Sequence, residues 1–153
     1  MKLIVFAVTI LFLSISLINS ILSFQARERN LSSIEGAPPI DLIDGIRITT
    51  SSFSTDYSSL SFRLTKEQVK EVQERLNDAE FKKRNYLNRE QSISDSFISF
   101  NLDIMANKTA YKMTVYNNSM VVIDDDTYLL TDAFLVSLLF NYVIEQIGYS
   151  EKN

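Results

Sequence analysis

The chain of 153 residues has no cysteine, no histidine and no tryptophan, and it contains only three glycines and two prolines. The lack of cysteine excludes disulfides, thiolate metal sites and cysteine nucleophiles. The lack of histidine removes the usual general base near neutral pH and the commonest metal ligand. Few glycines and prolines favour regular elements joined by short polar turns. We therefore predict no cofactor, no metal site and no enzymatic activity.

The charge balance is slightly acidic, with 15 basic and 19 acidic residues and a net charge of −4. Nucleic-acid binding needs a basic surface that displaces counterions from phosphates, and none is visible in the sequence. The one tight basic run, at residues 82–84, suits the solvated end of a helix. We therefore predict that nucleic acid is not a partner.

Residues 3–24 form a long apolar run without a single charge. A helix of about 20 apolar residues crosses a bilayer, whereas the apolar part of a signal peptide has about 7–15. Length therefore predicts a transmembrane helix, with residues 1–24 as an anchor in membrane lipid. A signal peptide cleaved after Ser20 is the alternative. Because only a short flank precedes the run, we expect the C-terminal domain outside the cytoplasm as part of a single-pass membrane protein, or secreted if the signal is cleaved.

The rest of the chain reads as a tether followed by one domain. Residues 25–39 mix charged and small residues and include Pro38-Pro39, which favours an extended segment. Residues 40–149 have the length of an ordinary single domain. A hydrophobic content of 46% and a charged content of 22% are normal for a globular protein.

Alternation of apolar and polar residues predicts an antiparallel meander of about five strands. The expected strands are residues 40–53, 60–64, 96–105, 111–115 and 120–123. The pairs Asn107-Lys108 and Asn117-Asn118 are turn signals, because asparagine tolerates a positive φ.

A first helix is predicted over residues 66–83. Thr65 and Gln68 have the spacing of a capping box, in which each side chain bonds the other's backbone N–H. A narrow apolar stripe then follows at helical spacing. Its members are Val69, Val72, Leu76 and Ala79.

A second helix is predicted over residues 132–147, with Thr131 as its N-cap and Gly148 just beyond its end. The helix is apolar over most of its circumference, so we expect it to be buried on more than one side. It could also cover the sheet and meet a partner or a membrane surface. Its polar stripe is a candidate interaction surface and comprises Ser137, Asn141 and Glu145.

Two further features invite a functional interpretation. Exposed aromatic side chains often mark interfaces. Four aromatic residues are expected to be exposed, because they lie near turns, near the end of the chain or on the polar side of a strand: Tyr57, Tyr86, Phe97 and Tyr149. The run of residues 124–126 offers three carboxylates to a hard cation, but adjacent residues point in different directions. We interpret this run as an acidic turn that ends a strand.

Three parts of the chain carry a resemblance to known proteins. They are the leader MKLIVFAVTILFLSISLINS, the capped helix LTKEQVKEVQERL, and the strands SFISFNLDIM, AYKMTVYN and SMVVID. In these parts the chain resembles small exported or membrane-anchored proteins of low-GC Gram-positive bacteria. The resemblance extends along the chain and involves no diagnostic motif. It implies a location and little about activity.

Together these features predict an α+β domain in which an antiparallel sheet of about five strands is packed by two helices and preceded by a transmembrane or signal helix. The predicted function is a non-catalytic binding or interaction module on the outer face of a membrane. The alternative is a membrane-associated regulator or immunity-type protein that docks a protein partner through its apolar C-terminal helix. An enzyme with an unrecognised site is the third hypothesis.

Overall fold

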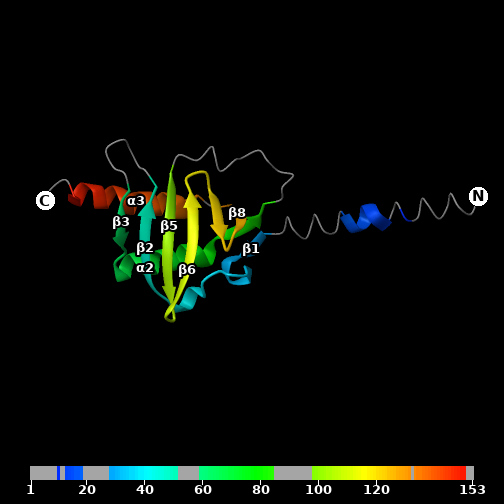
Figure 1. Cartoon of the computed structure of the whole chain (residues 1–153), viewed down its shortest axis with the longest axis horizontal. Coiled ribbons are helices and arrows are strands. Elements are labelled where there is room, and N and C mark those ends of the chain that lie inside the picture. Colours follow the sequence, from blue (N-terminus) through cyan, green and yellow to red (C-terminus); the bar gives the residue numbers. More distant parts are fainter. Residues whose placement is uncertain are drawn as a thin grey trace, which may run out of the picture.

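The structure is a computed structural model, and it describes residue 10 and residues 13–18, 28–51, 59–84, 98–131 and 133–150. These residues form the predicted α+β fold, with one antiparallel sheet in the order β1-β4-β8-β7-β6-β5-β2-β3 (Figure 1). The strands are β1 (Glu28–Asn30), β2 (Ile43–Thr50), β3 (Ser61–Arg63), β4 (Glu80–Lys83), β5 (Ser99–Ala106), β6 (Thr109–Tyr116), β7 (Met120–Ile123) and β8 (Asp126–Leu130).

The sheet has eight strands, so the prediction of about five is wrong. Strands β1, β4 and β8 were not predicted, and none of them is longer than five residues. Such short segments hold too few residues for apolar alternation to stand out. β4, with the sequence EFKK, also continues the charged pattern of the helix before it. These segments become strands because each pairs with a neighbour in the sheet: β1 with β4, β4 with β8, and β8 with β7.

One face of the sheet is covered by helices and the other is open. Along β5, Phe100, Leu102 and Ile104 are buried, whereas Asn101 and Asp103 between them are exposed. Helices α2 (Lys66–Asp78) and α3 (Phe134–Ser150) both cross the strands on the buried side (Figure 1). The fold therefore has two layers, and one side of the sheet faces solvent.

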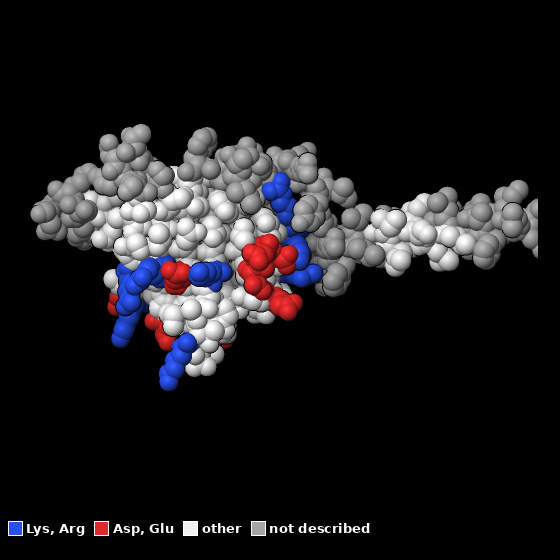
Figure 2. Space-filling view, in the orientation of Figure 1, with Lys and Arg blue, Asp and Glu red and all other residues white. Residues whose placement is uncertain are grey.

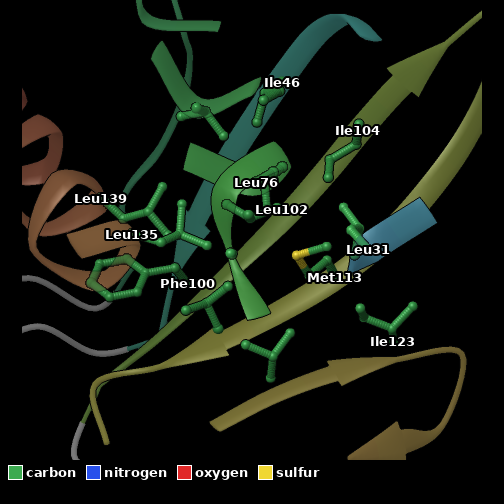
Figure 3. Close-up of a cluster of buried hydrophobic side chains, with 14 of the residues drawn as sticks. Leu31, Ile46, Leu76, Phe100, Leu102, Ile104, Met113, Ile123, Leu135 and Leu139 are labelled. Atoms are coloured by element: carbon green, nitrogen blue, oxygen red, sulfur yellow. The ribbon is translucent and has the colours of Figure 1, made fainter. Parts of the chain in front are cut away.

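The core lies between the sheet and the two helices. Figure 3 shows Leu76 of α2 and Leu139 of α3 among side chains that rise from the strands, such as Leu102. Leu31, in the short 3-10 turn η1 (Leu31–Ser33), is fully buried in the same cluster. This part of the segment predicted as a tether therefore contributes to the folded domain.

Helix α2 begins as predicted but ends earlier. The Thr65 hydroxyl accepts a hydrogen bond from the Gln68 backbone N–H, and the Gln68 side chain accepts one from the Thr65 N–H, which completes the capping box. The helix ends at Asp78 instead of residue 83, because Ala79 is extended and Phe81 enters the sheet as a buried residue. Most of the basic run at residues 82–84 thus belongs to a strand.

Helix α3 also differs at both ends from the predicted residues 132–147. The Thr131 hydroxyl donates a hydrogen bond to the Glu80 carbonyl oxygen (3.3 Å), which ties the end of β8 to β4. The helix starts at Phe134 and runs through Gly148 to Ser150. Gly148 is therefore inside the helix and does not terminate it.

The transmembrane helix predicted within residues 3–24 is wrong. In the part of the chain that the structure describes, no helix is both long enough and apolar enough to cross a membrane. Within the predicted span, the described helical residues are Ile10 and residues 13–18.

Candidate functional site

Helix α3 leaves three large apolar side chains exposed. Phe134 is 63% exposed, Ile144 is 48% exposed and Phe140 is 38% exposed. A single exposed apolar residue is ordinary in a folded protein, but several on one helix face form a patch, and patches mark interaction sites.

The position of this patch follows from the helical period. Leu135, Leu139, Tyr142 and Val143 are buried, and at roughly 100° per residue they lie on one side of α3. The opposite side comprises Phe134, Ser137, Phe140, Asn141, Ile144, Glu145 and Gly148, all exposed. We call these seven residues the α3 outer face. Only Glu145 among them carries a charge.

The structure brings together some of the predicted interaction residues. Ser137, Asn141 and Glu145 all lie on the α3 outer face. The aromatic candidates Tyr57, Tyr86 and Phe97 lie outside the described residues. The three exposed apolar residues of the face were not predicted as a site, because α3 is apolar nearly all round and periodicity cannot tell which side a neighbour covers. The expectation that this helix is buried on more than one side is therefore wrong.

Two contacts with α2 hold α3 in place. The Tyr142 hydroxyl donates a hydrogen bond to a Glu71 carboxylate oxygen (2.7 Å). The guanidinium carbon of Arg75 lies 5.5 Å from the ring centroid of Phe134, within the range of a cation–π contact. A charge-assisted hydrogen bond to a buried tyrosine orients the helix about its own axis, so the outer face is presented in one orientation.

The Tyr142 contact predicts a pH dependence of stability. Burial first, and then the hydrogen bond to Glu71, raise the pKa of Tyr142 above its ordinary value. The unfolded chain releases this proton near pH 10 while the folded chain retains it, so stability is full below pH 10 and falls above it. We expect the slope of unfolding free energy against pH above pH 10 to be smaller in Tyr142→Phe, by up to about 1.4 kcal/mol per pH unit.

Urea titrations at several pH values would measure this slope. Tyr128 also has a raised pKa, chiefly through burial, so Tyr142→Phe should reduce the slope without abolishing it. Glu71→Gln is the matched control, because it keeps the tyrosine buried and leaves most of the slope. An unchanged slope in Tyr142→Phe would contradict the assignment.

The open face of the sheet is a second surface, and charged and polar side chains lie on its neighbouring strands. Strand register places Arg47 opposite both Arg63 and Asp103. In Figure 2, which views this face, basic and acidic side chains lie side by side in a band across it. Beside this band, the Thr114 hydroxyl donates a hydrogen bond to the Asn101 side-chain oxygen (3.0 Å). Because this face carries mainly charged and polar side chains, we interpret it as a solvated one.

A shallow groove of about 510 Å³ lies between α2 and the 3-10 turn η2 (Ile40–Leu42). It is lined by Ile40, Asp41, Lys70, Gln73, Glu74, Asn77 and Asp78. The Gln73 amide donates hydrogen bonds to the carbonyl oxygens of Ile40 (2.9 Å) and Ile43 (3.1 Å), so it serves to hold η2 on α2. Across the described ranges, no group of acidic, histidine or cysteine side chains is arranged to hold a metal ion.

In the acidic run at residues 124–126, Asp124 and Asp125 form the turn between β7 and β8, and Asp126 begins β8. Asp124 (φ 46°) and Asp125 (φ 67°) adopt the left-handed conformation that a tight hairpin requires. The Asp126 carboxylate pairs with the Lys83 amine, and this hydrogen bond raises the pKa of Lys83. The run thus joins two strands of the sheet and ties β8 to β4.

No protein-family model, no curated protein and no solved structure matches this chain. Its function must therefore be inferred from the three surfaces themselves. The open sheet face carries mainly charged and polar side chains, and the Gln73 amide in the groove beside α2 holds η2 on that helix. The α3 outer face, by contrast, presents large apolar side chains to solvent.

Proposed function

We propose that the protein is a non-catalytic interaction module that docks a protein partner through the α3 outer face. The observation that carries the proposal is the exposure of Phe134, Phe140 and Ile144 on one side of a single helix. Covering apolar area stabilises a complex by about 25 cal/mol per Å² before the costs of association. The centre of a protein interface is depleted in charge and enriched in aromatic residues, as this face is.

The shape and rigidity of the face favour a protein as the partner. Small molecules bind in concave pockets, whereas the outside of a helix is convex. An exposed helix face suits a groove or another helix on a partner. Because the contacts of Tyr142 and Arg75 hold the face in one orientation, little conformational freedom is lost on docking.

The composition of the chain supports a non-catalytic role, since it supplies neither histidine nor cysteine for acid–base or nucleophilic chemistry. A membrane anchor is not part of the proposed function, because no described helix could span a bilayer. Export stays a prediction from the sequence of residues 3–24, which also suits a signal peptide cleaved after Ser20.

Photo-crosslinking from the α3 outer face tests the proposal. We expect p-benzoylphenylalanine at position 140 to give a defined crosslinked product in cells that make the protein, because a protein partner docked on the α3 outer face contacts this side chain. Adding Ser137→Arg should reduce the product by about tenfold or more, since a charge without a partner would be buried at the centre of the contact.

The matched control places the same photoreactive residue at Thr114 on the open sheet face, where we expect little product. Ser137 is exposed, so Ser137→Arg should leave the thermal unfolding midpoint nearly unchanged. Equal products from positions 140 and 114, or a product that Ser137→Arg does not reduce, would refute docking through this face.

A further inference from the structure

Four of the seven residues of the α3 outer face are placed symmetrically about position 139. Phe134 and Ile144 lie five residues before and after this position, and Ser137 and Asn141 lie two residues before and after it. Two apolar side chains therefore flank two polar ones at equal distances along the helix. When two copies of this helix pack antiparallel, the apolar groups of one copy meet apolar groups of the other, and polar groups meet polar groups. A two-fold interface needs this self-complementarity, because the same patch is used on both copies.

The charges around the face are also complementary to themselves. Arg75 lies over Phe134 at the start of α3, whereas Glu145 lies near the opposite end of the outer face. In an antiparallel pair of α3 helices, the start of one helix meets the end of the other. Arg75 of each copy then approaches Glu145 of the other copy, and symmetry makes this contact twice. Opposite charges matched in this way set the orientation of two partners.

The centre of the face suits close packing of two helices. Ser137 is small, so it allows the helix axes to approach to the usual 8–10 Å. Its hydroxyl can exchange a hydrogen bond with the Asn141 amide of the other copy, which satisfies the polar groups that the contact covers. Phe140 lies next to the two-fold position, so its ring can pack against the same ring of the other copy.

We propose that the partner of the α3 outer face is a second copy of this chain, with the two α3 helices antiparallel about an axis near residue 139. This inference rests on the proposed docking function and names its occupant. The outer face has seven residues, fewer than the roughly 20–30 that each side of a standard interface contributes. We therefore expect a weak dimer with a Kd on the order of 10 µM.

Sedimentation velocity on the purified full-length chain tests the dimer. Between about 1 µM and about 500 µM, the weight-average mass should rise from the monomer value of 17.5 kDa toward twice that value. Glu145→Arg and Arg75→Glu should each raise the Kd about fivefold, because like charges then meet at both ends. The double variant, which restores opposite charges, should return the Kd to within about twofold of the parent. Lys112→Glu on the open sheet face should leave it unchanged.

A second measurement does not depend on the charges. Because the chain has no cysteine, Asn141→Cys introduces a single thiol, and a short bismaleimide should join two copies through it. Thr114→Cys on the open sheet face is the control and should give little crosslinked dimer at the same concentration.

The outcomes separate this inference from the proposed function. A chain that stays monomeric at about 500 µM, or a double charge variant that does not recover association, overturns the homodimer. If a monomeric chain still crosslinks to a different protein from position 140, only the choice of partner is wrong. If both association and crosslinking from position 140 are absent, the docking function fails as well.

Discussion

Replacing Phe100 with alanine will lower the free energy of unfolding by about 3–5 kcal/mol. Phe100 lies on the covered side of β5 and is 0% exposed. Figure 3 shows the Phe100 side chain beside Leu135 and Leu139 of α3. Removing the ring leaves a cavity at this junction, and the surrounding side chains relax only partly. Urea unfolding followed by circular dichroism would measure the loss, which is a large share of the roughly 5–15 kcal/mol typical of a domain.

Phe134→Ala is the matched control, because the same atoms are removed from a side chain that is 63% exposed. We expect it to cost no more than about 1 kcal/mol, including the contact with Arg75. The same variant should weaken docking through the α3 outer face. If both substitutions destabilise the fold equally, α3 does not present Phe134 to solvent, and the proposed site would be wrong.

Replacing Gly36 with alanine will lower the free energy of unfolding by about 2–4 kcal/mol. Gly36 has a φ of 76°, and a residue with a Cβ loses roughly 1–2 kcal/mol in this left-handed region. A Cβ at this position would also lie only 2.6 Å from the Cβ of Asp124. Asp124 belongs to the tight turn between β7 and β8, so it cannot move away without disturbing the hairpin. Thermal or urea unfolding would measure the effect.

The other two glycines are internal controls. A Cβ at Gly45 would lie 3.9 Å from Met105, an ordinary contact, so Gly45→Ala should change stability little. A Cβ at Gly148 would meet nothing within 4 Å, and alanine favours a helix by about 0.8–1 kcal/mol over glycine, so Gly148→Ala should stabilise the fold. Adding Asp124→Gly to Gly36→Ala removes the steric clash. We therefore expect it to restore the part of the free energy of unfolding that the clash removes, but not the part that the positive φ at position 36 removes. Equal effects at Gly36 and Gly45 would disprove the clash.

Several local signals were predicted correctly, and these involve residues close in sequence. Thr65 and Gln68 are three residues apart, and their capping box starts α2 as expected. Asn107 and Lys108 have positive φ values and form the turn between β5 and β6. The alternation in β5 also identified its buried side. These features were predictable because their energetics depend on only a few neighbouring residues.

Elements that depend on distant pairing were not predictable from the local pattern. β4 forms because Phe81 and Lys82 pair with Leu130 and Leu129 of β8. The same pairing ends α2 at Asp78, since the chain beyond it is more stable in the sheet than in the helix. The membrane helix was predicted from apolar length alone, whereas no helix among the described residues is long and apolar enough to cross a bilayer.

For the candidate site, the sequence by itself determined that the last helix is apolar nearly all round, with Ser137, Asn141 and Glu145 as a polar stripe. It also determined that the chain has no histidine and no cysteine. Only the tertiary structure decided which apolar side of α3 is covered. Tyr142 reaches Glu71, 71 residues away in sequence, and this contact helps to orient the helix. Packing between distant residues selects the buried side, so Phe134, Phe140 and Ile144 are left in solvent as the surface on which the proposed function depends.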